Sequence, residues 1–245
     1  MAARNGVVVQ AIGLRKVYRS GEVEVEALRG ASLTVRRGEL LSIMGPSGCG
    51  KTTLLNCVSG LDDVSAGRVA IEGHDLAQMT DDERTRFRAQ RLGFVFQSYN
   101  LLPVLSAEEN VMLPLLVVGL KEAEARRRAR ASLEAVGIAH RATHLPRELS
   151  GGEQQRAAIA RALVNEPAIV FADEPTGNLD TVKGQQILHL LRDLNRQRAL
   201  TLVVVTHDPK VTEVSHRVLR MDSGAIVAEE RGGAAAAGAA RGPRR

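Results

Sequence analysis

A glycine-rich segment near residue 50 constrains the fold of this chain more than any other feature. Residues 45–53 read Gly-Pro-Ser-Gly-Cys-Gly-Lys-Thr-Thr and fit the pattern G-x-x-x-x-G-K-[ST]. The apolar run Leu40–Met44 precedes the segment, and residues 53–58 have the composition of a helix. Strand, loop and helix in this order form a phosphate-binding unit, so we expect an α/β domain with the loop at the end of a buried strand.

The residue types of this loop suit a polyphosphate and a divalent cation. Its glycines let the backbone turn N–H groups inward, and the following helix N-terminus favours negative charge. We expect Lys51 to reach the β- and γ-phosphates and the Thr52 hydroxyl to ligate Mg²⁺. The predicted phosphate-binding residues are Gly45, Pro46, Ser47, Gly48, Cys49, Gly50, Lys51, Thr52 and Thr53.

Polar residues follow three other apolar runs of the sequence. Gln97 follows Gly-Phe-Val-Phe, Asp173 and Glu174 follow Ile-Val-Phe-Ala, and His207 follows Val-Val-Val-Thr. Because ligands of open α/β sheets bind at the carboxyl ends of strands, we expect these side chains and Lys51 to meet at one edge. Asp173 is predicted to hold Mg²⁺, and Glu174 to polarise an attacking water.

A second segment with exposed backbone character covers residues 149–156, Leu-Ser-Gly-Gly-Glu-Gln-Gln-Arg. Ser150 and Glu153 have the spacing of a capping box, which is typical of an ordinary helix start. Gly151 and Gly152 leave the helix N-terminus open, and such an end also binds phosphate. Since the first loop already takes one triphosphate, the second reading is a site completed by another copy of the chain.

The rest of the sequence predicts how these motifs are arranged. Alternating apolar residues at 23–27 and 31–35 predict a half-buried antiparallel sheet, whereas continuous apolar runs predict buried parallel strands. Residues from about 98 to 165 have helical patterns and form a predicted helical subdomain. The predicted fold is α/β, with a mainly parallel sheet, an N-terminal antiparallel β subdomain and this helical insertion, over residues 7–230. Residues 231–245, rich in Ala, Gly and Arg, are predicted to be a disordered basic tail.

Charge and composition argue against nucleic acid as a partner. The net charge is +5, and Arg231, Arg241, Arg244 and Arg245 lie in the predicted tail. Aromatic residues make up 2% of the chain, too few for a base-stacking surface. No apolar run has the length of a membrane helix, because Pro114 and Gly119 break the longest. We expect that run, residues 111–120, to be mainly core, with any exposed residues lining a groove for a membrane partner.

The two cysteines are too few for a disulfide framework and favour a reducing compartment. Cys49 lies just before a predicted helix N-terminus and Lys51, and both features favour a thiolate. We therefore expect Cys49 to be the reactive thiol and Cys57 to be an inert core residue.

Taken together, these motifs resemble the ATP-binding subunits of ABC transporters, over residues from Val7 to about Ala228. The resemblance implies binding of ATP and Mg²⁺, ATP hydrolysis, and a homodimer in the ATP-bound state. It also implies that Gln97 contributes to the metal site, that His207 contacts the γ-phosphate and that Tyr18 stacks on adenine. The implied motifs are the Walker A loop at 45–53, the Q-loop at Gln97, the signature at 149–156, Walker B at 169–174, the D-loop at 177–180 with Asp180, and the switch histidine His207.

Residues 93–103, 109–115 and 173–180 are similar to the MacB/LolD group, with the division-associated FtsE proteins close by. Thr52 stands where that group often has Ser, and either hydroxyl can ligate Mg²⁺. The resemblance implies a permease on a separate chain, energised for export, lipoprotein release or mechanotransmission, with this subunit peripheral at the cytoplasmic face of the inner or plasma membrane. An FtsE-like regulator of cell-wall hydrolysis and a nutrient-importer ATPase remain alternatives, and a soluble ABC ATPase acting on ribosomes or DNA is the weakest.

Overall fold

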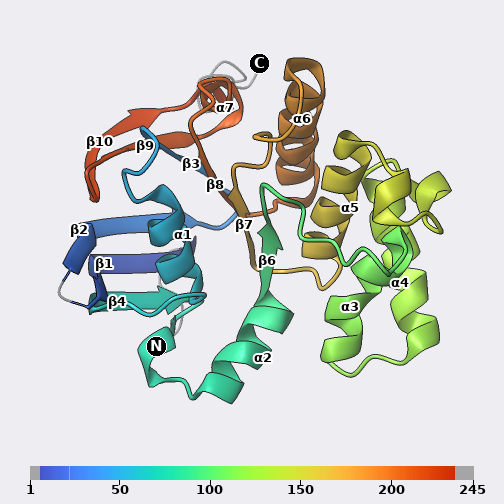
Figure 1. Cartoon of the computed structure of the whole chain (residues 1–245), viewed down its shortest axis with the longest axis horizontal. Coiled ribbons are helices and arrows are strands. Elements are labelled where there is room, and N and C mark those ends of the chain that lie inside the picture. Colours follow the sequence, from blue (N-terminus) through green and yellow to red (C-terminus); the bar gives the residue numbers. More distant parts are fainter. Residues whose placement is uncertain (1–5, 22, 235–245) are drawn as a thin grey trace, which may run out of the picture. The chain divides into compact units, whose positions relative to one another are not determined.

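Residues 6–21 and 23–234 are described by a computed structural model, in which the chain forms two units. The first unit comprises Met1–Thr80 and Arg192–Arg245, and the second comprises Asp81–Leu191 (Figure 1). The second unit contains strands as well as helices, so it is wider than the helical subdomain predicted at about 98–165. The limits of that subdomain therefore stay a prediction.

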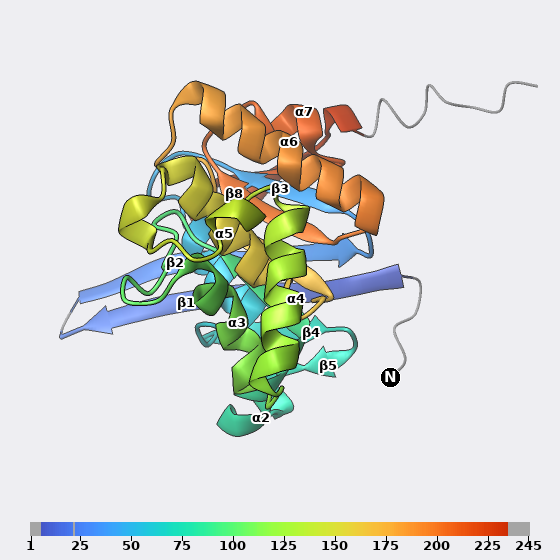
Figure 2. The ribbon, with the colours of Figure 1, turned by 90° about the vertical axis from the view of Figure 1, so that its right-hand side faces the viewer.

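The N-terminal part of the first unit is an antiparallel sheet of four strands in the order β2-β1-β4-β5. The strands β1 and β2 form a long pair that Figure 2 shows side by side, and β4 lies on the other side of β1. This arrangement confirms the predicted antiparallel subdomain. The strand bounds are β1 (Val7–Ser20), β2 (Val23–Arg36), β4 (Ala66–Ile71) and β5 (His74–Asp75).

The apolar alternation of β2 is buried over only part of its length. Ala31, Leu33 and Val35 are buried, as the alternation predicted, but Val23 and Val25 are 63% and 56% exposed. The pairing of β1 with β4 begins at Arg15, so the far half of the β1–β2 pair lacks a third strand to cover it. The half-buried reading is therefore wrong for residues 23–25.

The second sheet portion of the first unit is centred on β3 (Leu40–Met44). Its neighbours β8 (Leu202–Thr206) and β9 (Arg217–Asp222) both run parallel to it. Every residue of β3 and β8 is buried, which confirms the prediction made from their continuous apolar runs. The strand β10 (Ala225–Arg231) pairs antiparallel with β9 at the edge.

The structure corrects the start of the predicted C-terminal tail. Arg231 belongs to β10 and lies opposite Arg217 in the β9–β10 ladder. Beyond the strand, the Gly232 amide donates to the His216 carbonyl at 3.0 Å, and the Ala234 amide donates to the Ser215 carbonyl at 3.0 Å. These bonds order the chain as far as Ala234, so the disorder predicted from residue 231 is wrong for 231–234. Residues 235–245 lie outside the described part of the chain.

The second unit contains a parallel pair of strands, β6 (Leu92–Val95) and β7 (Ile169–Asp173). Phe94 and Phe171 lie opposite each other in this pair, with ring centroids 6.0 Å apart. Together with β3, β8 and β9, this pair confirms an α/β fold with mainly parallel strands. The helices of the chain are α1 (Lys51–Ser59), α2 (Asp81–Arg91), α3 (Ala107–Val117), α4 (Glu122–Ala135), α5 (Gly151–Leu163), α6 (Thr181–Arg198), α7 (Val211–Val214) and the short 3₁₀ turns η2 (Leu76–Gln78), η3 (Ala139–Arg141) and η4 (Pro146–Glu148).

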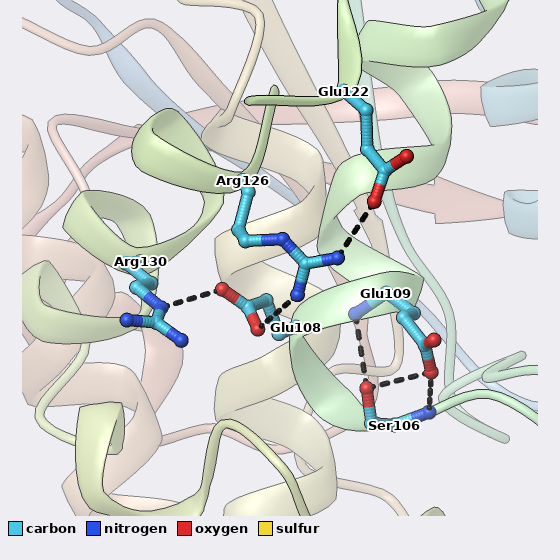
Figure 3. A network of polar contacts seen from close by, with 6 residues as sticks. All are labelled: Ser106, Glu108, Glu109, Glu122, Arg126 and Arg130. Atoms are coloured by element: carbon cyan, nitrogen blue, oxygen red, sulfur yellow. Dashed lines mark hydrogen bonds and ion pairs between the residues drawn. The ribbon is translucent and has the colours of Figure 1, made fainter. Parts of the chain in front are cut away.

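A buried glutamate holds α3 and α4 together within the second unit. The Glu108 side chain is 3% exposed and pairs with Arg126 at 3.3 Å and with Arg130 at 2.6 Å (Figure 3). Arg126 also pairs with Glu122 at 2.8 Å. A buried carboxylate needs such partners, since an unpaired charge is costly away from water. Removing either arginine would therefore weaken the packing of the two helices.

The apolar run at 111–120 is divided between core and surface. Val111, Met112 and Leu115 are buried, whereas Leu116 is partly exposed and Val117 is 71% exposed. Three of the ten residues are buried, four are half-buried and three are exposed, so the expectation that the run is mainly core is wrong. The run covers the end of α3 and the turn after it, and only one side of the helix packs inward. Within residues 6–21 and 23–234, no helix combines the length and the apolar content that a bilayer-spanning helix needs.

Candidate functional site

The phosphate loop predicted at residues 45–53 connects β3 to α1 in the first unit. Helix α1 begins after Gly50, which adopts φ 98° and provides no side-chain cap. The first turn of α1 also contains no acidic residue. The N-cap residue therefore adds no side-chain bond to this helix end, whose partial positive charge favours an anion.

Two glycines of the loop are required by close backbone approach. A Cβ atom on Gly45 would lie 2.1 Å from the Met221 carbonyl oxygen, and one on Gly50 would lie 2.6 Å from the Ala27 carbonyl oxygen. Real Cβ atoms do not come this close to backbone, so any side chain here would displace the loop from β9 or β2. The backbone of the loop is thus fixed by its packing against these neighbouring strands.

Lys51 folds back over the loop from the first turn of α1. Its Nζ donates to the carbonyl oxygens of Gly45 and Pro46, both at 2.9 Å, and the residue is 7% exposed. Pro46, Ser47 and Gly48 beside it are exposed. The structure therefore places a positive charge at an exposed loop, next to a helix N-terminus without a side-chain cap. This arrangement attracts polyphosphate.

Tyr18, for which adenine stacking stays a prediction, lies near the same helix. Its hydroxyl donates to the Asp62 carboxylate at 2.7 Å and also interacts with the Thr53 side chain. The Lys16 ammonium lies 4.9 Å from the centroid of the Tyr18 ring, and Tyr18 is exposed. Burial and the Asp62 carboxylate raise the pKa of Tyr18, so the phenol stays neutral. These contacts fix the ring beside α1.

His207 lies directly beyond β8 and is exposed. Thr206 is opposite Met44 in the parallel β3–β8 ladder, so His207 and Gly45 are the first residues beyond the paired strand ends. Within the first unit, the register therefore brings the predicted switch histidine and the phosphate loop to one edge, as the sequence indicated.

The second unit carries the other predicted catalytic residues. In the β6–β7 ladder Val95 is opposite Ala172, so Gln97 and Glu174 each lie two residues beyond the same register position. Asp173 is the last residue of β7 and is half-buried. Glu174 has φ 45°, in the left-handed region that non-glycine residues rarely adopt. Such a conformation persists only where the surroundings hold it, and it occurs often at functional sites.

The signature segment forms the capped start of α5. The Ser150 hydroxyl accepts from the Glu153 amide at 3.4 Å, while Glu153 accepts from the Ser150 amide at 2.8 Å. These bonds, with Arg141 at 2.9 Å, lower the pKa of Glu153 to about 2. The capping-box reading of this segment is thus confirmed. Ser150 is exposed, and Gly151 and Gly152 are half-buried, so the helix end stays accessible.

Asp180 lies at the start of α6 and caps it. Its carboxylate accepts from the Lys183 amide at 2.9 Å and pairs with the Lys183 ammonium at 3.2 Å. The hydrogen bond from the Lys183 backbone amide lowers the pKa of Asp180, and the hydrogen bond and charge of the Lys183 side chain lower it further. The aspartate is thus ionised and exposed at a helix N-terminus.

The structure does not support the expected reactivity of Cys49. Both cysteines are buried, Cys49 at 5% exposure and Cys57 at 2%. The Cys49 sulfur packs against Gly45, where a Cβ atom would lie 2.7 Å from it. Close packing of the loop has covered a thiol that the sequence placed at an open helix end. Burial raises the pKa of Cys57 to about 11, as fits the expected inert thiol.

Sequence reasoning missed two groups that fix these loops. Asp62 bonds both Tyr18 and Lys16 across more than 40 residues of sequence. Arg161 on α5 donates to the carbonyl oxygens of Tyr99 and Asn100, which follow Gln97. Neither residue belongs to a spaced motif, and long-range pairing of this kind leaves no local signal in one sequence.

The loop, the uncapped helix and the strand-end residues define a P-loop nucleotide-binding protein. A family model described as ABC transporter matches residues 28–177. This chain belongs to the ABC transporter family, as an ATP-binding subunit with ATPase activity.

Relatives of known name cover nearly the whole chain. An ABC transporter ATP-binding protein of Thermotoga maritima is 49% identical over 92% of this chain and 96% of its own length. The lipoprotein-releasing system ATP-binding protein LolD of Saccharophagus degradans is 46% identical over 89% and 96%. The macrolide export ATP-binding/permease protein MacB of Syntrophobacter fumaroxidans is 45% identical, and this chain spans 30% of its length.

Solved structures agree with these sequence relatives. A dimeric ATP-binding cassette in a post-hydrolysis state, bound to ADP and Pi, has a TM-score of 0.84 to this chain and 42% identity. The match covers 91% of this chain and 98% of that one. A match of this coverage extends over residues of both units.

Proposed function

We propose that this chain binds ATP with Mg²⁺, hydrolyses it, and passes the resulting conformational change to a membrane permease. Relatives named for lipoprotein release and macrolide export favour export or release over import. In this account the chain is peripheral at the cytoplasmic face of the membrane, held there by the permease. The observation that carries the proposal is the phosphate loop, where Lys51 folds over the loop beside a helix N-terminus that has no side-chain cap.

The residues assigned to the metal have the donor chemistry that Mg²⁺ prefers. Thr52 offers a hydroxyl, Asp173 a carboxylate and Gln97 an amide oxygen. Among the described residues, no group of three or more His, Cys, Asp or Glu could hold a metal alone. This fits an ion that takes its remaining ligands from phosphate oxygens and water. When bound, Mg²⁺ neutralises charge on the β- and γ-phosphates.

The hydrolytic roles fall to residues at the strand ends. Glu174, whose backbone adopts φ 45°, polarises the attacking water. His207 contacts the γ-phosphate, and Lys51 stabilises the charge that develops on the leaving β-phosphate oxygen. Tyr18, near the turn end of the β1–β2 pair, supports the adenine ring.

The N-terminus of α5 from another copy of the chain completes the ATP site. The related cassette is a dimer, and the capped but accessible start of α5 at Ser150, Gly151 and Gly152 suits the same arrangement here. Asp180 lies in the D-loop, which follows Glu174 in the sequence, and we propose that it takes part in the contact between the two copies. ATP would thus join two copies, and hydrolysis would release them.

An exposed apolar surface supports the proposed permease contact. Val117 on α3 is 71% exposed, and Leu102, Val104 and Leu116 of the same unit are also exposed. Exposed apolar side chains are candidates for a protein interface. We name Leu102, Val104, Leu116 and Val117 the apolar patch and propose that they form one contact surface.

The test couples membrane capture to activity. The chain is purified from detergent-solubilised membranes with its bound permease, and ATPase activity is measured alone and in nanodiscs. Val117→Asp should leave basal ATPase activity unchanged and remove most stimulation by the permease, because a charge cannot be buried in the contact. Val227→Asp, at a similarly exposed valine of β10, is the matched control. Stimulation that survives in Val117→Asp would contradict the patch, and the absence of any membrane partner would contradict the transporter role.

A further inference from the structure

Two hydrogen bonds between Gln97 and Asn178 join the loops that follow β6 and β7 in the second unit. The Gln97 Nε2 group donates to the Asn178 Oδ1 atom at 3.3 Å, and the Asn178 Nδ2 group donates to the Gln97 carbonyl at 3.0 Å. Gln97 follows β6, and Asn178 follows β7 by five residues. The pair therefore connects the Q-loop to the segment that comes directly after Glu174.

Gly177 is shaped to the Gln97 side chain. A Cβ atom on Gly177 would lie 2.8 Å from Gln97 Nε2, 3.1 Å from Cδ and 3.2 Å from Cγ. The glutamine side chain thus occupies the space that any other residue at 177 would fill. This observation is independent of the hydrogen bonds and points to the same conclusion, that Gln97 is seated on residues 177 and 178.

The backbones of the two loops are fixed by one helix, α5. Arg161 donates to the Tyr99 carbonyl at 2.8 Å and to the Asn100 carbonyl, while Tyr99 and Asn100 have φ 61° and 50°. Buried Gln155 donates to the Pro175 carbonyl at 2.6 Å. These bonds anchor the backbones of both loops. The conformation of the Gln97 side chain therefore depends on the residues that contact it.

We propose that Asn178 and Gly177 are positioning residues for Gln97. Asn178 holds the amide by hydrogen bonding, and Gly177 provides the space in which it rests. Together they keep the Gln97 oxygen, which takes no part in the bond to Asn178, oriented for the metal. The inference rests on the proposed function, in which Gln97 supplies a metal ligand.

The experiment compares Asn178→Ala, Gly177→Ala and Gln97→Ala in the full chain, with Gly184→Ala as the glycine control. A Cβ at Gly184 makes only ordinary contacts, 3.5 Å from Thr176 Cβ. In Gly177→Ala the clashing atoms belong to a flexible side chain, so the fold is kept and Gln97 moves. We expect Asn178→Ala and Gly177→Ala each to lower kcat about tenfold and to raise the Mg²⁺ concentration for half-maximal rate, with little change in KM for ATP.

A second measurement follows Gln97 without nucleotide or metal. In chain labelled with ¹⁵N-glutamine, the Gln97 side-chain amide signal is assigned by its loss in Gln97→Ala. That signal should move toward the free-amide position in Asn178→Ala and Gly177→Ala and stay in place in Gly184→Ala. An unmoved signal in both positioning variants would overturn the proposed seating of Gln97.

The double variants separate this inference from the proposed function. If the positioning residues act through Gln97, adding Asn178→Ala or Gly177→Ala to Gln97→Ala should change kcat less than about twofold. Effects that persist undiminished in the Gln97→Ala background would overturn the inference. A Gln97→Ala chain with parental turnover and Mg²⁺ dependence would instead overturn the proposed role of Gln97 itself.

Discussion

At the scale of single residues, function depends on charges and glycines held in tightly packed positions. Lys51 is nearly buried and folds over the phosphate loop, and Gly45 and Gly50 have backbone oxygens where a side chain would be. The sequence motif predicted Lys51, Gly45 and Gly50 because phosphate binding by such a loop requires these residue types. Burial of Cys49 was not predictable from the motif, since it depends on how the loop packs against Gly45.

Replacing Lys51 by alanine should abolish ATP hydrolysis and weaken ATP binding. The substitution removes the positive charge that faces the phosphates, whereas the backbone amides of the loop remain. Turnover is expected to fall by at least about a hundredfold, an effect typical of losing one group that stabilises developing charge. Steady-state ATPase assays and equilibrium binding of a fluorescent ATP analogue measure the two effects. Normal turnover in Lys51→Ala would refute the assignment of the phosphate loop.

At the scale of elements, the strand registers and helix ends place the site. The β3–β8 and β6–β7 ladders align His207 with Gly45 and Gln97 with Glu174, as expected from parallel strands. The start of α5 is set by the Ser150–Glu153 capping box, whose spacing is visible in the sequence. The exposure of Val23 and Val25 was not predictable, because it depends on where β4 stops pairing with β1.

The cap of α5 predicts a dependence of stability on pH. Hydrogen bonds from Ser150 and the charge of Arg141 lower the pKa of Glu153 to about 2, below its ordinary value of 4.5. A lowered pKa in the folded chain means that the stabilisation is complete above pH 4.5 and is lost as the pH falls toward 2. Glu153→Gln should therefore be destabilised relative to the parent at pH 7, and the difference should shrink in acid.

Urea unfolding of the parent and Glu153→Gln between pH 3 and pH 7 measures this difference. Glu134→Gln, at an exposed glutamate of α4, serves as the control and should show a small difference that does not follow the same course. A constant gap between the parent and Glu153→Gln over the whole pH range would contradict the role of the ionised carboxylate.

At the scale of the whole molecule, we describe the chain as an ATPase and propose that a second copy completes its site. The α/β class, the antiparallel N-terminal sheet and the motif positions were predictable, because each depends on local patterns or on a spaced motif. Contacts such as Arg161 with Tyr99 and Gln97 with Asn178 were not, because they join residues 62 and 81 positions apart. Sequence patterns therefore locate the reacting groups, and the structure shows what holds them.

The central claim is tested most directly by Glu174→Gln. The substitution keeps the shape of the side chain and removes the base, so ATP should bind without being hydrolysed. The accessible start of α5 from a second copy should still contact the γ-phosphate, and the closed state should accumulate. Adding Ser150→Arg should disrupt it, because a long charged side chain cannot fit at this glycine-lined helix end.

The measurement is size-exclusion chromatography with light scattering, with and without Mg-ATP. The account predicts a Glu174→Gln dimer that forms only with Mg-ATP and is lost when Ser150→Arg is added. Repeating the measurement with the permease in nanodiscs controls for weak dimerisation of the isolated subunit. A Glu174→Gln chain that stays monomeric at saturating Mg-ATP in both settings, or that hydrolyses ATP at the parental rate, would contradict the account.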